Sequence, residues 1–369
     1  MGQSAVTDAV CWSAAMEKSE SFYRLTPASV LEAVESAGMT PTGHCTALNA
    51  LENRVFDVRV ESDGDRPFRH LVAKFYRPGR WSPEAIGDEH RLLFALREAE
   101  IPVCAPIRFD DGDSLRTIHD IHYALWPRTG GRSPDELSDA QVEVLGRLLA
   151  RIHAVAASVQ APHRPRFDSK EVPLYALDAL EAGNFIPPSC LARYRAAVEQ
   201  VVEIYDRLAN DTALQPIHGD CHLGNLLYGD AGWFFLDFDD MRLGPAVQDV
   251  WMLLPGRDAY AERQRRLLVK AYRTFRPFDE RSLALVEPLR AFRFVFYAGW
   301  IARRWDDPSF PDAFPHFGSE DYWERETRDL EEQLERIRTS PNPVSSEMSD
   351  AVVNEPSVPL TNKDFFWDL

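Results

Sequence analysis

The stretch HGDCHLGNLLYGDAGWFFLDFDD, residues 218–240, carries most of the information on the fold and chemistry of this chain. It sets two histidines and several carboxylates around two short apolar segments, NLLY and WFFLDF, which GDAG joins. Two apolar segments separated by a Gly-containing turn predict a small β-hairpin. Asp220 and Asn225 stand before this hairpin, and Asp237 stands at the end of its second strand.

Three interpretations of this stretch compete. In the first, His218, Asp220 and His222 bind a catalytic metal, since both residue types are zinc ligands, but this set needs further ligands and leaves Lys74 unexplained. In the second, the residues are structural, which is the usual role of any one of them taken alone. In the third, a carboxylate holds and deprotonates an acceptor hydroxyl, while an amide and a second carboxylate hold Mg²⁺ on nucleotide phosphates.

The N-terminal part of the chain offers a lysine for such phosphates. The segments NRVFDVRVE and FRHLVAKFY alternate apolar and polar residues, and they predict two antiparallel strands around the turn DGDRP. Lys74 lies on the second of these strands. SPE at residues 82–84 opens a helix that runs through Arg97 and carries Glu89. This order predicts an ion pair in which Glu89 fixes Lys74 towards the phosphates.

The composition of the 369 residues excludes several classes of protein. A net charge of −17 argues against general nucleic-acid binding, and an acidic protein that handles an anion needs a local lysine or divalent ion. The five cysteines are scattered, as expected in a reducing cytoplasm. Residues 1–20 have no basic region and are interrupted by Asp8, so we expect no signal peptide. No apolar run is long enough for a membrane span.

The pattern of elements predicts an α+β fold with two lobes. We expect an N-terminal extension at 1–25 and a small β-rich N-lobe at 26–127, a nucleotide-binding sheet with one internal helix. A larger helical C-lobe with the catalytic loop follows at 128–340, and a flexible tail at 341–369 ends the chain. A linker is expected near Trp126–Gly131. A cleft between two lobes is a natural small-molecule site.

Local signals also predict individual helices. Thr26 is the expected N-cap of the first, and Ser138 with Gln141 forms a capping-box pattern before a strongly amphipathic segment. A helix of about twenty residues is expected to end near Asn210. The Pro-containing segment 165–190 is expected to be irregular.

Beyond these patterns, HGDCHLGN followed by LDFDD resembles the Brenner motif of the aminoglycoside phosphotransferase and choline kinase superfamily, relatives of the protein kinases. LNALENRVFDV, VAKFYRPGRWSPEAIGDEHRLL, GGRSPDEL and DDMRLGPAVQDVWMLL narrow the resemblance to the bacterial stress response kinase A family of YihE-like serine/threonine protein kinases. The resemblance covers residues 25–335 and implies a bilobal protein-kinase-like fold. It also implies ATP and Mg²⁺ as cofactors and a protein hydroxyl as phosphate acceptor.

The resemblance assigns roles residue by residue. It implies that Asp220 is the catalytic base and that Asn225 and Asp237 are Mg²⁺ ligands, with Asp237 also counted as catalytic. Lys74 becomes the phosphate-binding lysine and Glu89 its helix partner. The nucleotide-covering loop at Leu48–Arg54 contains no glycine. Backbone and side-chain amide groups are therefore expected to contact the nucleotide in place of the close backbone approach of a glycine-rich loop. The remaining nucleotide contacts are assigned to Asn49, Ala50, Asn53, Leu125 and Pro127.

The resemblance also implies that His218 braces the catalytic loop and that Asp249 anchors it from the next helix. It assigns no role to His222 or Asp239. The expected partners are ATP and a protein or other hydroxyl-bearing acceptor, with no nucleic acid and no membrane, and the chain is expected to be a monomer.

Two alternatives remain open from the sequence. The first is a small-molecule kinase of the aminoglycoside, choline or homoserine kinase type, whose acceptor cleft would be lined with acidic side chains. The second is a nucleotide-binding scaffold without turnover, against which intact Lys74, Asp220, Asn225 and Asp237 argue.

Overall fold

The computed structural model describes residues 22–23, 25–62 and 69–339. The predicted tail at 341–369 and nearly all of the predicted N-terminal extension at 1–25 lie outside these residues. The described chain forms two compact units, and the first takes in three separate segments. They are the chain up to Ser133, Val159–Arg164 and Leu226–Asp239; the second unit holds Pro134–Ser158, Pro165–Asn225 and the chain from Asp240 onward. The lobe boundaries expected from the sequence stay a prediction.

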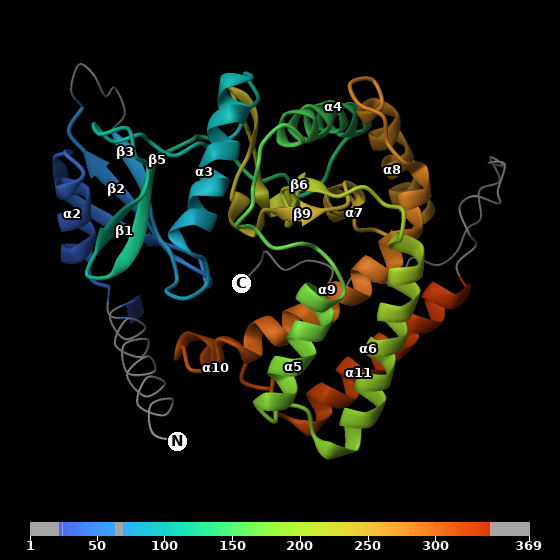
Figure 1. The fold of residues 1–369 in the computed structure, drawn as a ribbon. Helices are drawn as coiled ribbons and strands as arrows, with labels where there is room; N and C mark the ends of the chain where they lie inside the picture. Colours follow the sequence, from blue (N-terminus) through green and yellow to red (C-terminus); the bar gives the residue numbers. More distant parts are fainter. Residues whose placement is uncertain (1–21, 24, 63–68, 340–369) are drawn as a thin grey trace. The chain divides into compact units, whose positions relative to one another are not determined.

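The first unit is built on a five-stranded sheet with the order β1-β2-β3-β5-β4 (Figure 1). All of its neighbouring strands are antiparallel. The strands are β1 Pro41–Leu48, β2 Arg54–Val60, β3 His70–Phe75, β4 Arg116–Ile118 and β5 Ile121–Pro127. The N-terminal antiparallel sheet predicted from the alternating segments is therefore confirmed.

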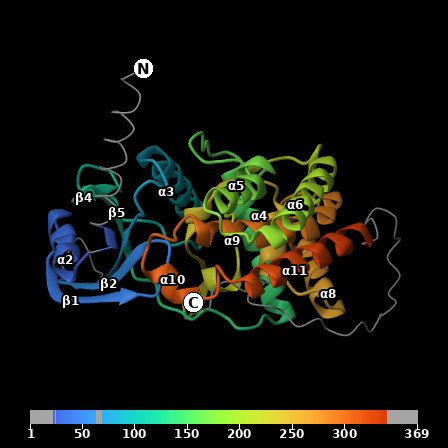
Figure 2. The same ribbon diagram turned by 90° about the horizontal axis from the view of Figure 1, so that it is seen from below.

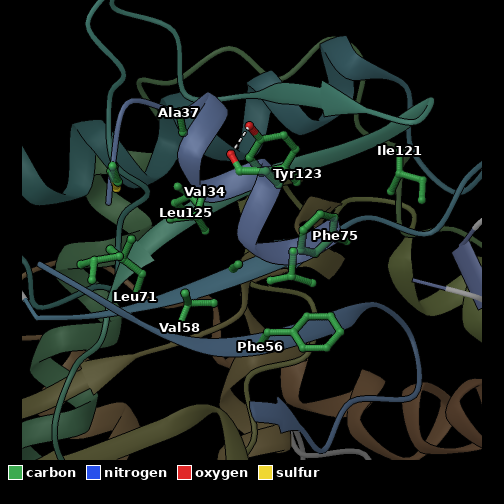
Figure 3. Packing of buried hydrophobic residues seen from close by; sticks show 14 of the residues in the cluster. Val34, Ala37, Phe56, Val58, Leu71, Phe75, Ile121, Tyr123 and Leu125 are labelled. Atoms are coloured by element: carbon green, nitrogen blue, oxygen red, sulfur yellow. Dashed lines mark hydrogen bonds between the residues drawn. The ribbon is translucent and has the colours of Figure 1, made fainter. Parts of the chain in front are cut away.

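One face of this sheet packs against α2, Pro27–Ser36 (Figures 1 and 3). Because strand side chains alternate between faces, Leu71 and Phe75 of β3 point to the helix together. The ring of Phe75 stacks on Tyr123 of β5 with centroids 5.4 Å apart, and the Tyr123 hydroxyl donates to the Ala33 carbonyl at 2.8 Å. Thr26 caps the helix, as the sequence predicts. This face forms the core of the first unit.

The opposite face of the sheet packs against α3, Pro83–Glu98, which Ser82 caps as predicted. Tyr76, directly after β3, and Ala124 with Trp126 of β5 cluster there with Ile86 of the helix. The alternation of β3 places Lys74 on this side, since its neighbours Ala73 and Phe75 belong to the α2 core. The phosphate-binding candidate thus lies on the face that carries α3.

The hairpin predicted from the opening stretch is present. It consists of β7, Leu226–Gly229, and β8, Gly232–Phe235. Both strands are tied to the rest of the first unit through single bridges, Val103 with Phe235 and Arg132 with Tyr228. Asp237 follows β8 at once, and a single 3₁₀ turn at Phe238–Asp240 comes next.

The second unit is mainly helical, as expected. Figures 1 and 2 show α6 and α11 side by side, and both pack against α9, while α4 packs against α8. The helices are α4 Asp139–Ala156, α5 Tyr175–Ala182, α6 Pro188–Ala209, α7 Val247–Leu253, α8 Ala259–Tyr272, α9 Val286–Ala302, α10 Ser309–Ala313 and α11 Glu320–Thr339. The predicted capping box of Ser138 and Gln141 is confirmed, and the end of α6 agrees with the prediction.

The expectation of an irregular segment at 165–190 is wrong in its middle part. A π-helical turn at Lys170–Leu174 leads directly into α5. This short helix packs against α9, where Gly299 leaves room for Ala176. Tertiary packing therefore stabilises a helix that is too short to be evident from its own sequence. Within the described residues, no helix has both the length and the apolar character to cross a membrane.

Candidate active site

The catalytic loop of the second unit starts directly after a short strand, β6, Gln215–Ile217. This strand pairs antiparallel with β9, Arg242–Gly244. Gly219 has a φ of +87°, and a Cβ atom at this position would collide with the carbonyl oxygen of Asp240. Only glycine accepts both the left-handed backbone and this close approach. The glycine of HGD is therefore needed to turn the chain into the loop.

Asp249 of α7 holds the start of this loop. Its carboxylate is fully buried and accepts hydrogen bonds from the backbone N–H groups of His218, at 2.8 Å, and Gly219, at 2.9 Å. His153 of α4 adds a third contact through Nε2 at 2.9 Å, and its Nδ1 lies 2.9 Å from the hydroxyl of Tyr272. A carboxylate that binds two consecutive amides fixes the direction of the chain. This is the geometry that the anchoring role expected for Asp249 requires.

Asp220 is partly exposed, with 27% of its side chain accessible. Arg293 of α9 donates to its Oδ1 at 2.9 Å, and Nε2 of His222 lies 3.3 Å from Oδ2. Burial alone would raise the pKa of Asp220, but His222 and Arg293 hold it well below its usual value. Burial also lowers the pKa of His222, so the permanent positive charge comes from Arg293. Asp220 therefore remains ionised over the physiological pH range.

Asn225 lies at the end of the same loop, in the 3₁₀ turn Leu223–Asn225. Its Nδ2 donates to the carbonyl oxygen of Asp220 at 2.9 Å. The bond fixes the rotation of the amide and turns its oxygen away from that carbonyl. An oxygen held in this way is suited to a hard cation such as Mg²⁺.

Asp237 belongs to the first unit and is the most exposed of the predicted site carboxylates, with 53% of its side chain accessible. Its backbone is left-handed, with a φ of +49°. Oδ1 pairs with Nζ of Lys74 at 2.8 Å, and Oδ2 takes no part in this contact. No group of three or more His, Cys, Asp or Glu side chains in the described parts of the chain is arranged to hold a metal ion. Such an ion would also need oxygens from the nucleotide, as is usual for Mg²⁺.

Lys74 is almost completely buried and lies between two carboxylates. Its Nζ is 2.8 Å from Asp237 and 3.2 Å from Oδ1 of Asp239, and it lies 5.1 Å and 5.9 Å from the ring centres of Tyr76 and Trp126. Burial alone would lower the pKa of Lys74, but Asp237 and Asp239 raise it above its usual value. The lysine is therefore charged and held next to Asp237.

The predicted ion pair between Lys74 and Glu89 is not formed. Glu89 instead pairs with Arg164 at 2.9 Å, and at most 1% of either side chain is exposed. Arg164 also donates to the carbonyl oxygens of Ala85, at 2.8 Å, and Asp239, at 2.6 Å. A guanidinium group can bind three acceptors in fixed directions, whereas an ammonium group is a single point of charge. Glu89 acts on Lys74 only through its charge.

Glu89→Gln is expected to destabilise the protein, contrary to what an exposed ion pair would suggest. The substitution leaves Arg164 buried beside a neutral partner, and removal of one member of a buried pair costs about 3–5 kcal/mol. The free energy of unfolding in urea measures this loss. Glu143→Gln is the matched control, because Glu143 and Arg147 form an exposed i,i+4 pair at 3.6 Å worth about 0.5 kcal/mol. Equal losses in the two variants would contradict the buried-pair assignment.

Leu125, one of the expected nucleotide contacts, has its side chain in the core of the first unit. It belongs to the core beneath α2, on the face of the sheet opposite to Lys74, and its carbonyl accepts from the Ile107 N–H at 2.7 Å. Its neighbours Ala124 and Trp126 lie on the Lys74 face instead. The expected contact of Leu125 with the nucleotide stays a prediction. Pro127 at the strand end stays a prediction.

The loop between β1 and β2 holds the other three predicted nucleotide contacts. Asn53 is buried, and both ends of its amide are used within the fold: Nδ2 donates to Asp239 at 3.1 Å, and Oδ1 accepts from the Arg77 N–H at 3.1 Å. These contacts brace the loop, and the expected contact of Asn53 with the nucleotide stays a prediction. Asn49 is exposed and Ala50 is half-buried, and both stay predictions.

Comparison with known proteins agrees with this geometry. A model of the phosphotransferase enzyme family matches residues 44–286, and the chain belongs to that family. It is 37% identical over 321 residues to stress response kinase A of Escherichia coli (strain K12) and, to the same extent, to serine/threonine protein kinase RdoA of Salmonella typhimurium (strain LT2). In both cases the match covers 87% of this chain and 96% of the relative. The chain is an ATP-dependent kinase of this family.

A solved structure shows the same fold. The amicoumacin kinase hAmiN, in complex with AMP-PNP and Ca²⁺, superimposes with a TM-score of 0.64 at 19% identity. The match covers 85% of this chain and 94% of hAmiN. At this identity the similarity concerns the fold.

Proposed function

We propose that the chain is a stress-response serine/threonine protein kinase that transfers the γ-phosphate of ATP to hydroxyl groups of proteins, its own hydroxyls among them. The observation that carries this proposal is the environment of Asp220. This carboxylate is partly exposed and is kept ionised by Arg293 at 2.9 Å. The backbone carbonyl oxygen of the same residue accepts a hydrogen bond from the Asn225 amide. The similarity to serine/threonine protein kinase RdoA, at 37% identity, supports a protein as acceptor.

In this proposal, Asp220 accepts a hydrogen bond from the acceptor hydroxyl and takes its proton. A bond forms between the hydroxyl oxygen and the γ-phosphorus, the bond to the oxygen shared with the β-phosphate breaks, and ADP leaves. Lys74 would contact the phosphates, and Asn225 and Asp237 would hold Mg²⁺ through an amide oxygen and a carboxylate oxygen. When bound, Mg²⁺ supplies positive charge to the phosphate oxygens.

The charge next to Asp220 bears on the choice of acceptor. A kinase for a cationic small molecule gains from acidic side chains around the acceptor, whereas the side chain that contacts the Asp220 carboxylate at 2.9 Å is the guanidinium of Arg293. Like charges repel, so a cationic acceptor is disfavoured at this position. This supports a neutral hydroxyl, such as that of serine or threonine, over an aminoglycoside or choline.

Incubation with γ-labelled ATP and Mg²⁺, with and without a generic protein acceptor, tests the proposed function. We expect label on protein, and none in the Asp220→Asn variant. Label found only on added choline, homoserine or aminoglycoside would support the small-molecule alternative. Nucleotide binding without any transfer would support a scaffold.

The proposal extends to the setting of the protein. We assign it to the cytoplasm, where its five cysteines would remain thiols. Four of them lie among the described residues and are free. We assign it as a monomer that itself carries phosphate after autophosphorylation. Light scattering with purified protein and mass spectrometry after incubation with ATP test these two points.

A further inference from the structure

We propose that Asp239 is a positioning residue that fastens the loop between β1 and β2, residues 49–53, to the phosphate-binding lysine. This inference rests on the proposed function, because it concerns the nucleotide half of the same site. Asp239 has no role in the assignments made from the sequence. Its contacts, all within the first unit, bring together side chains from three different segments.

The carboxylate of Asp239 is 2% exposed and is surrounded by donors. Nδ2 of Asn53 lies 3.1 Å from Oδ2, Nζ of Lys74 lies 3.2 Å from Oδ1, and Arg80 donates a hydrogen bond to Oδ2. A buried carboxylate is costly unless its charge is paired and its oxygens accept hydrogen bonds. Oδ2 accepts hydrogen bonds from Asn53 and Arg80, and the charge of Lys74 lies next to Oδ1, so the positions of the loop, of β3 and of the segment after β3 depend on one side chain.

The loop itself explains why such an anchor is needed. It contains no glycine, so its position is not set by a close backbone approach of the glycine-rich kind. Arg77 instead donates through Nε to the carbonyl of Glu52 and through Nη2 to that of Leu51, both at 2.9 Å. Asn53 joins this arginine segment to Asp239, because its Oδ1 accepts from the Arg77 N–H. Side chains therefore hold the loop in one position before any nucleotide binds.

The backbone of Asp239 extends the connection to α3. Its carbonyl oxygen accepts from Nη1 of Arg164 at 2.6 Å, and the same guanidinium pairs with Glu89. Asp239 also follows the proposed Mg²⁺ ligand Asp237 by two residues. A substitution at Asp239 is therefore expected to displace both the covering loop and Lys74. These are the parts of the first unit that are proposed to contact the phosphates.

The test compares Asp239→Asn with Asp57→Asn. Asp57 is a buried carboxylate of the same sheet that pairs with His70 at 3.1 Å and with Arg128. Both substitutions remove one buried, paired charge, so a purely structural role predicts the same outcome for both. The measurements are kcat and KM for ATP, hydrogen–deuterium exchange of residues 49–53, and thermal unfolding.

We expect Asp239→Asn to lower kcat/KM for ATP on the order of 100-fold, since a displacement of about 1 Å at a phosphate contact has this effect. Exchange in residues 49–53 should rise at the same time. Asp57→Asn should lose thermal stability without either change. The proposal is overturned if loop exchange in Asp239→Asn equals that of the wild type, or if Asp57→Asn reproduces both effects.

A second variant keeps the test decisive if Asp239→Asn does not fold. Asn53→Ala removes the bond between the loop and Asp239, together with the bond to the Arg77 N–H, and leaves the carboxylate paired with Lys74 and Arg80. Faster exchange of residues 49–53 with a raised KM for ATP is expected, and an unchanged loop would overturn the proposal. The exchange measurement needs no turnover, so failure of the proposed kinase activity and failure of this inference are distinguishable.

Discussion

Asp220→Asn is expected to reduce phosphoryl transfer by about 10²–10⁴-fold, the range that loss of a general base typically produces. The substitution keeps the size and shape of the side chain and removes its capacity to take the hydroxyl proton. Nucleotide affinity should remain close to that of the wild type, because the proposed role of Asp220 is on the acceptor side. Initial rates with labelled ATP and calorimetric titration with AMP-PNP measure the two quantities.

Asp139→Asn serves as the control for this variant. Asp139 also pairs with an arginine, Arg263 at 2.8 Å, but both side chains are about half exposed at the start of α4. Its loss should leave the rate nearly unchanged. If Asp220→Asn retains more than about a third of the wild-type turnover, which is far above the range given for a general base, the assignment of the base is incorrect.

Asp237→Asn is expected to lower the rate by about 10²–10³-fold at limiting Mg²⁺, since it weakens the binding of the ion that would stabilise charge on the transferring phosphate. It removes one negative charge from a proposed ligand, so higher Mg²⁺ should restore part of the rate. Asparagine is the suitable substitution, because Asp237 has a φ of +49° and Asn accepts the left-handed region better than alanine. The Mg²⁺ dependence of the initial rate is the measurement.

Asp230→Asn is the matched control, because Asp230 is an exposed carboxylate in the turn of the hairpin that leads to Asp237. It should keep the Mg²⁺ dependence of the wild type. High Mg²⁺ should not rescue Asp220→Asn, which lacks the base and not a metal ligand. An equal response of the Asp220 and Asp237 variants to Mg²⁺ would show that the proposed division of roles is incorrect.

Much of the fold was predictable because its signals are local. Thr26, Ser82 and Ser138 each precede a helix and cap it, and alternating residues mark the strands of the first sheet. The short helix α5 was missed, because its stability depends on packing against α9. Local patterns specify an element when its own residues supply the stabilising contacts.

The candidate site divides in the same way. Asp220, Asn225 and Asp237 lie in one short stretch of sequence, so their spacing alone predicted them as site residues. Arg293 is 73 residues from Asp220 and Arg164 is 75 residues from Glu89, so no spacing rule connects them. Which basic side chain neutralises a buried carboxylate is decided by how distant elements pack. The pairing of Lys74 with Glu89 was wrong for this reason.

The composition of the first unit from three chain segments has a consequence for synthesis of the protein. Lys74 and Glu89 leave the ribosome with the first segment, whereas Arg164 and Asp239 belong to the second and third. Domains fold as their chains emerge, but here buried charges of the early segment must wait for partners made later. A fragment that ends at Ser133 would hold a lysine and a glutamate whose burial is uncompensated. Incomplete chains therefore lack these buried contacts of Lys74 and Glu89 until Asp239 has been added.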